Sequence, residues 1–198
     1  DIMFSRKELK VGTEKYEEYY KSKPENVFKD ELFRKEPGLL SPDSKYYDPL
    51  LFNAAAATFT AVDLLQPLVE KEVSNKPQNK IDINGISSFL KNWTIKLGAV
   101  DVGFTLVKPH HIYSHVGRGE DYGNKVELNH KFAIAFTVEM NHESLSYAPK
   151  GPIVMESAQQ YLNAGAIAVQ VAQFIRNLGF DARAHIDANY RLICPIVA

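Results

Sequence analysis

One face of the longest apolar stretch carries the residues with the clearest chemical potential. Tyr161, Gly165, Ala168, Ala172 and Ile175 are spaced three or four residues apart, as on one side of a helix. Small side chains on that side allow a second backbone, another subunit or a flat cofactor to approach closely. A hydroxyl at Tyr161, one turn before Gly165, would project into the space created there. Plain packing against a sheet is the simpler explanation of the same spacing.

A second candidate group alternates along residues 184–190. His185, Asp187 and Asn189 would share one side of a strand end and converge on a ligand there. His185 beside Asp187 would also suit proton transfer. The alternative is a turn in which the Asp and Asn side chains bond to their own backbone.

Metal chemistry has weak support in the sequence. His110, His111 and His115 lie within six residues, but neighbouring histidines point apart and no carboxylate follows at helical spacing. Zinc needs three or four converging ligands, so we expect histidines of a surface loop and no metal site. Cys194 is the only cysteine, which excludes a disulfide framework, a cysteine zinc site and a self-contained iron–sulfur cluster.

The elements that position these residues mix helices and strands. We expect, in order, a helix near 13–22, a helix over 54–70 interrupted near Pro67, a helix after Asp82 ended by Gly98, a strand over 99–107, a strand over 132–140 covered on both faces, a helix over 154–178 closed by Gly179, and a strand over 180–186. This order predicts an α+β fold or a mixed α/β sandwich, of which we expect the α+β fold.

Proline and glycine punctuate residues 1–50, which predicts an extended N-terminal arm that wraps its own domain or a neighbouring subunit. Residues 51–198 form the domain proper. The chain opens on Asp1 and closes on the apolar, strand-like run 193–198, so we expect a fragment of a longer protein.

Composition narrows the function classes. The chain has 198 residues, with 23 Lys and Arg against 24 Asp and Glu, for a net charge of −1. That balance gives no electrostatic case for nucleic acid or an anionic membrane. No apolar run is long enough to span a bilayer, and the expected location is cytoplasmic or peripheral to a membrane.

Three stretches together resemble a known family. Residues 132–140, Tyr161 on the long helix, and residues 173–182 are similar to the corrinoid-binding part of reductive dehalogenases. The run 193–198 fits the segment just before that family's Gly-Leu-Gly-type stretch, and residues 1–6 and 12–16 also look like dehalogenase-like proteins. The resemblance covers most of the chain and is strongest from about residue 130 onward.

The resemblance implies a nitroreductase-like mixed sheet flanked by helices, holding cobalamin without its lower axial base. It implies iron–sulfur clusters on a ferredoxin-like segment further along the chain, which reduce the cobalt. Tyr161 matches the proton donor to a small organic substrate, and Asp187 or Asn189 falls where the family has an active-site Asn. With these, Gly165 and His185 are the expected cofactor contacts. A basic side chain beyond residue 198 would lower the pKa of the Tyr.

The departures leave alternatives open. The cluster cysteines, the basic partner and the Gly-rich stretch are not in this chain, so it would not deliver electrons alone. Epoxyqueuosine reductase uses the same cofactors on a different substrate, and a reductase of that kind is one alternative. A non-catalytic domain that sequesters a corrinoid, and a dimerisation domain whose arm 1–50 is exchanged between subunits of a homodimer, are the other interpretations.

Overall fold

The computed structural model describes residues 6–7, 9–73, 76–77, 82–117 and 121–198. Parts of the N-terminal run 1–6 and of the segment before Asp82 lie outside this range. The described chain is an α+β structure, with helices and one antiparallel pair of strands.

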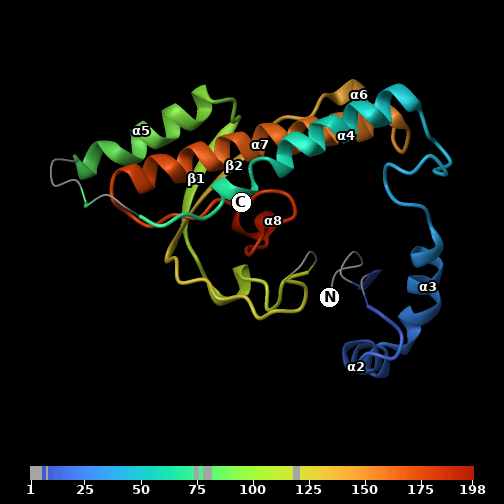
Figure 1. The fold of residues 1–198 in the computed structure, drawn as a ribbon. Helices are drawn as coiled ribbons and strands as arrows, with labels where there is room; N and C mark the ends of the chain where they lie inside the picture. Colours follow the sequence, from blue (N-terminus) through green and yellow to red (C-terminus); the bar gives the residue numbers. More distant parts are fainter. Residues whose placement is uncertain (1–5, 8, 74–75, 78–81, 118–120) are drawn as a thin grey trace.

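Two long helices lie along each other and form the backbone of the larger part of the molecule. α7 (Gly151–Asn177) packs along α4 (Pro49–Asp63), as Figure 1 shows. α5 (Ile83–Lys96) lies beside the C-terminal half of α7, and the strands β1 (Asp101–Leu106) and β2 (Phe132–Thr137) run close to both. We call this part, residues 48–198, the body.

Apolar residues on these helices form two core clusters. One joins α7 to the segments that follow α4 and α7, and its buried members are Val69, Val169, Ala172, Ala182, Ala184 and Ile186. The other joins α5, β1 and α7, with Leu90, Ala99, Val102, Ile167 and Val171 buried. Of the α7 face that the spacing predicted, Gly165 and Ala172 are buried and Ala168 and Ile175 pack partly buried against the core, whereas Tyr161 is 40% exposed.

Local signals explain where the helices begin and end. α4 begins before the predicted residue 54, because the Asp48 carboxylate accepts the backbone N–H groups of Leu50 and Leu51, both at 2.9 Å. It ends at Asp63, before the 3₁₀ turn η2 (Gln66–Leu68). Gly98 and Gly179 follow α5 and α7 with φ of 118° and 88°, as predicted for helix ends.

The sheet is smaller than the sequence predicted. β2 was expected to continue to residue 140 and to be covered on both faces, but it ends at Thr137 and Phe132 is 73% exposed. In the described residues β2 pairs only with β1, with Val102 opposite Phe136 and Leu106 opposite Phe132. α5 and α7 cover the Val102 end, and the other end of that face is open to solvent.

Two predicted strands are wrong. Residues 180–186 form no strand, because their one backbone bond to a neighbouring segment, from Ala184 N–H to the Val69 carbonyl at 2.9 Å, does not extend into a ladder. Residues 193–198 contain the short helix α8 (Cys194–Val197), in which Pro195 occupies the first turn and favours a helical φ.

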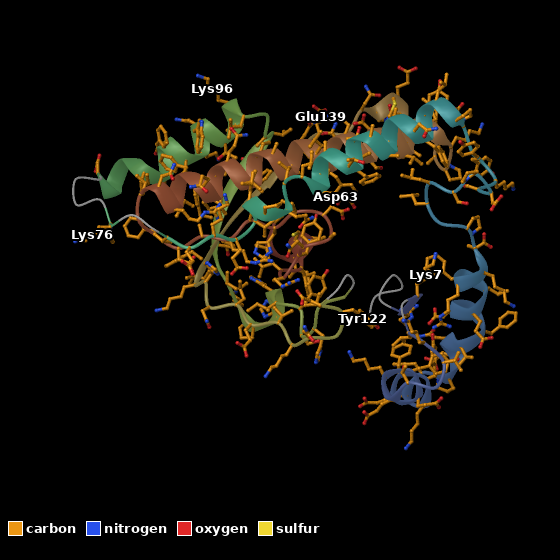
Figure 2. The ribbon with its side chains drawn as sticks, in the orientation of Figure 1. Lys7, Asp63, Lys76, Lys96, Tyr122 and Glu139 are labelled. Carbon is orange, nitrogen blue, oxygen red and sulfur yellow. The ribbon has the colours of Figure 1, made fainter. Side chains whose placement is uncertain are left out.

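The N-terminal arm holds α2 (Glu14–Ser22), the turn η1 (Pro24–Asn26) and α3 (Val27–Lys35). α2 confirms the predicted helix near 13–22, with the Thr13 hydroxyl accepting the Tyr16 N–H. In Figure 1 both helices stand away from α4 and α7, joined to them by the segment 36–48. Tyr122, on the loop between β1 and β2, faces the arm and packs against its cluster of Leu9, Tyr16 and Tyr20 (Figure 2).

None of the described helices combines the length and the apolar character that crossing a bilayer requires.

Candidate functional site

Tyr161 lies on α7 with its side chain 40% exposed. Its ring is tilted by 41° against the ring of Phe59 on α4, with 6.1 Å between the ring centroids. The aromatic contact holds one face of the ring while the side chain stays accessible. The phenol is therefore not sealed among aliphatic core residues.

Gly165 lies one turn further along α7 and is buried. A Cβ built on it would be 3.1 Å from Leu65 Cδ1 and 3.7 Å from Ile186 Cγ2. The missing side chain thus admits two aliphatic groups of this same chain. Gly165 also brings the segment after α7 against the helix, next to the predicted polar residues.

Arg183 organises those polar residues. Its guanidinium donates from Nη1 to the Asn189 carbonyl at 3.1 Å and from Nη2 to the Asn189 side-chain oxygen. The Asn189 amide in turn donates to Gln66 Oε1 at 3.1 Å, and Gln66 Nε2 donates to the Asp187 carbonyl at 2.8 Å. Because no strand forms here, a turn with Ala188 at φ 63° gathers these groups around one guanidinium.

His185 joins the same cluster through one ring nitrogen. Its Nδ1 accepts the Arg191 backbone N–H at 3.2 Å and lies 3.3 Å from Arg183 Nη1. Burial, together with the positive charges of Arg183, His130 and Arg191, lowers the pKa of His185 to about 3. The ring is therefore neutral near pH 7, and it has no imidazolium proton to transfer.

Sequence reasoning missed the residues that build this site. Arg183 and Gln66 were not singled out, nor was Arg176, which is only 2% exposed on α7. Arg176 donates to the carbonyls of Leu68 at 2.9 Å and Ala182 at 2.8 Å, tying the segment after α4 to the segment after α7. An arginine directly after the apolar pair Phe174 and Ile175 was the available signal, since burial of a cation requires partners.

The three clustered histidines do not converge on a metal site. The rings of His110 and His111 meet edge to face at 4.6 Å, His111 Nδ1 lies 3.3 Å from the Lys108 N–H, and His115 contacts Ser114. Within the part of the chain that the structure describes, no three His, Cys, Asp or Glu side chains could hold a metal ion together. Cys194 is free and exposed.

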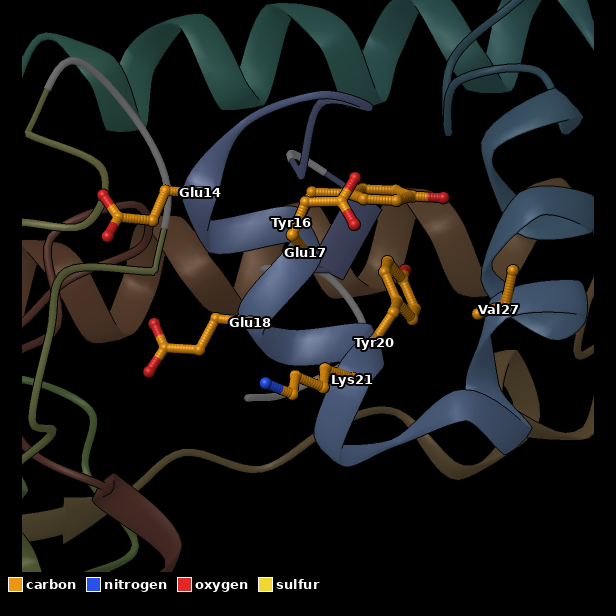
Figure 3. Close-up of a pocket in the computed structure, with 7 residues that line it drawn as sticks. All are labelled: Glu14, Tyr16, Glu17, Glu18, Tyr20, Lys21 and Val27. Carbon is orange, nitrogen blue, oxygen red and sulfur yellow. The ribbon is translucent and has the colours of Figure 1, made fainter.

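Two surface cavities lie away from the predicted site. The larger, of about 760 Å³, is on α2 and is lined by Glu14, Tyr16, Glu17, Glu18, Tyr20, Lys21 and Val27 (Figure 3). The other, of about 400 Å³, lies where residues 139–142 meet the first half of α7, with Glu156 and Gln160 in its lining. Tyr161 follows Gln160 in the chain but lines neither cavity.

Comparison with known proteins identifies no family for this chain. No family model matches the chain, and no curated protein matches it.

Proposed function

We propose that this chain is part of a cobalamin- and iron–sulfur-dependent reductase resembling the reductive dehalogenases, with a nitroreductase-like fold. In this proposal Tyr161 donates a proton to a small organic substrate that is reduced at cobalt. The observation that carries the proposal is the accessible phenol of Tyr161 on α7, one turn from the buried Gly165.

The residues predicted to contact a corrinoid differ in how accessible they are to one. A flat macrocycle needs a proton donor that it can reach, and Tyr161, at 40% exposure, is accessible, although it lines neither of the two cavities. Gly165 does not, because Leu65 and Ile186 already fill the space beside it. The Asn189 amide is likewise engaged by Arg183 and Gln66. Tyr161 is the residue through which this chain would meet the cofactor and its substrate.

A bound corrinoid would supply the reducing equivalents and the nucleophilic metal, which is chemistry of the cofactor itself. In this proposal the phenol oxygen of Tyr161 is the atom that carries the proton to be transferred. Contact with Phe59 limits the orientations of the ring, so the hydroxyl is presented in a restricted direction. A substrate carbon that gains electron density beside that hydroxyl would take its proton.

The proposal is tested in two steps with the full chain. Adding hydroxocobalamin should change its visible spectrum and bring it through gel filtration with the protein. After chemical reduction with titanium(III), the complex should release bromide from a bromophenol. Tyr161→Phe should keep the spectral change and lower the rate about 10²-fold or more, the usual contribution of a general acid.

Tyr47→Phe, which changes a phenol on the segment before α4, is the matched control and should leave the rate unchanged. An equal rate in Tyr161→Phe and the parent removes Tyr161 as the proton donor. If hydroxocobalamin neither shifts nor co-elutes, the enzyme proposal and the corrinoid-binding alternative both fail for this chain.

Exposed apolar residues favour a second candidate, a dimerisation domain. Phe104, Leu106 and Phe132 line the open end of one sheet face with 46%, 58% and 73% exposure, and Phe28 on α3 is 71% exposed. Sedimentation velocity tests it: a parent dimer that dissociates in Phe132→Ser supports this candidate, and a monomeric parent excludes it.

A further inference from the structure

The tautomer of His185 is fixed by its two contacts. Both the Arg191 backbone N–H and Arg183 Nη1 can only donate, and both approach Nδ1, at 3.2 and 3.3 Å. Nδ1 must therefore be the unprotonated nitrogen of a neutral ring. The single ring proton sits on Nε2, which is left as a hydrogen-bond donor.

His130 adds a second ring to this region. It precedes β2 and is one of the groups whose influence lowers the pKa of His185. Among the described residues, both of its ring nitrogens are buried and make no hydrogen bond of normal geometry, although Nε2 lies 3.2 Å from Asp181 Oδ2. Buried polar atoms in native proteins are nearly always hydrogen-bonded, so the remaining ring nitrogen can accommodate a partner.

The charges around these rings are arranged with cations inside and anions outside. The side chains of Arg183 and Arg191 are 5% and 18% exposed. Their carboxylate partners Glu70 and Asp121 are 71% and 65% exposed. Asp181, beside His130, is 74% exposed. Water screens the outer carboxylates more strongly than the inner guanidinium groups, and Arg183 and Arg191 accordingly both lower the pKa of His185.

We propose that His130 and His185, flanked by Arg183 and Arg191, bind an anionic oxygen of a ligand, a carboxylate or a phosphate. The Nε2–H of His185 donates to that oxygen, and a ring N–H of His130 supplies a second donor. The site adjoins α7, since Ile186 touches Gly165. It does not depend on the proposed proton transfer, and its test uses neither a corrinoid nor Tyr161.

The first measurement is made on the parent chain, labelled with ¹⁵N in its histidine rings. Long-range ¹H–¹⁵N correlation spectra should show His185 neutral with its proton on Nε2 from pH 7.5 down to pH 5. The His185→Asn variant assigns the signal by its loss. A ring that carries its proton on Nδ1, or that becomes charged near pH 6.5, would overturn the proposal without any ligand being added.

The second measurement titrates inorganic phosphate and, separately, acetate at constant ionic strength. Saturable shifts of the His185 and His130 ring nitrogens are expected with at least one of them. Phosphate alone, or acetate alone, would identify the class of oxygen that the site takes. Linear, non-saturating shifts with both anions would contradict the site.

Charge variants distinguish a specific anion-binding site from non-specific electrostatic attraction. Arg191→Gln should weaken the apparent affinity at least fivefold, because it removes the more exposed of the two guanidinium groups. Lys96→Gln removes one positive charge from the exposed end of α5 and should leave the affinity unchanged. Equal weakening in both variants would show that the anion responds to net charge only.

Discussion

The arm and the body bury charged groups in opposite ways. In the arm Asp30 is 2% exposed and meets a charge of opposite sign, with Arg6 Nε 2.7 Å from one carboxylate oxygen and Nη2 3.1 Å from the other. The Tyr20 hydroxyl donates to the same carboxylate at 3.0 Å. In the body Arg176 is equally buried, yet its hydrogen bonds go to backbone carbonyls and to one side-chain amide, that of Gln173.

The pKa shifts record this difference. Hydrogen bonding to Arg6 lowers the pKa of Asp30, which means that its partners outweigh the cost of burial. Burial lowers the pKa of Arg176, because carbonyl dipoles compensate the lost water less fully than a carboxylate would. The arm is thus stabilised by the ion pair of Arg6 and Asp30, to which the Tyr20 hydroxyl adds a hydrogen bond. The body is stabilised by apolar helices, with a cation that satisfies loop carbonyls.

The largest effect is expected when the ion pair of the arm is broken. Asp30→Ala leaves the Arg6 guanidinium without its carboxylate, and removal of one partner of a buried pair costs about 3–5 kcal/mol. Amide hydrogen exchange in α2 and α3 should accelerate by orders of magnitude, while exchange in α7 stays slow. Asp43→Ala, at an exposed position, is the control. Equal acceleration in α7 would show that arm and body unfold as one unit.

The matching change in the body is expected to be somewhat smaller. Arg176→Met preserves the aliphatic bulk but leaves the carbonyls of Leu68 and Ala182 without donors, at about 1–3 kcal/mol for each. Urea unfolding followed by Trp93 fluorescence should report a total loss of about 3 kcal/mol. Arg176→Lys keeps a cation with fewer donors and should fall between Met and the parent. A Met variant as stable as the parent would mean that water satisfies both carbonyls.

The contrast between the regions also explains what the sequence predicted. Periodic apolar spacing and the stops at Gly98 and Gly179 predicted the helices α5 and α7, and the pattern near 13–22 predicted α2, because these signals are local. The body's polar cluster depends on contacts far apart in the chain, such as Gln66 with Asp187 and Asn189. Alternation of polar residues over 184–190 suggested a strand end, with a turn as the alternative. The structure has the turn, but the Asn189 side chain bonds to Arg183 and Gln66.

In the candidate site, too, local spacing predicted some features and distant contacts determined the others. The positions of Tyr161 and Gly165 on one helix follow from spacing, and the structure confirms that helix. What lies beside them does not follow, because Leu65 and Ile186 reach Gly165 from segments that no periodicity relates to α7. The ion pair of Arg6 and Asp30 was likewise not predicted, because its members lie 24 positions apart in the sequence.

Lowering the pH should destabilise the arm and the body in different pH ranges. The pKa of His185 is lowered from 6.5 to about 3 in the folded body, so between these values the unfolded chain binds more protons. The stability contributed by the neutral ring is complete above pH 6.5 and is lost as the pH falls. At about 1.4 kcal/mol per pH unit, the body should lose about 2 kcal/mol between pH 7 and pH 5.

Asp30 behaves in the other sense within the acid range. Its pKa is lowered from 3.8, so its contribution persists above that value and is lost only below it. Trp93 fluorescence in urea at pH 7, 6 and 5 follows the body, and hydrogen exchange, corrected for its intrinsic pH dependence, follows α2. His185→Gln should flatten the pH dependence of the body. Parallel losses in arm and body over this range would contradict the assignment.

The smallest effect concerns the contact that joins the two regions. Tyr122 packs partly against the cluster of Leu9, Tyr16 and Tyr20, and Lys15 Nζ lies 5.1 Å from the centre of its ring. A cation–π contact at such a site contributes about 0.5–1 kcal/mol, so Tyr122→Ala should destabilise each region by no more than this. Its main consequence is freedom of the arm relative to the body, because Tyr122 packs against the arm's cluster from the loop between β1 and β2.

Small-angle scattering measures this freedom as an increase in the radius of gyration of Tyr122→Ala, with unfolding midpoints near those of the parent. Tyr122→Phe keeps the ring over which Lys15 lies and should restore the parent's radius. If Tyr122→Ala instead lowers the stability of the body by as much as Arg176→Met, the arm is an integral part of the core. The opposite ways of burying charge would then belong to one cooperative unit rather than two.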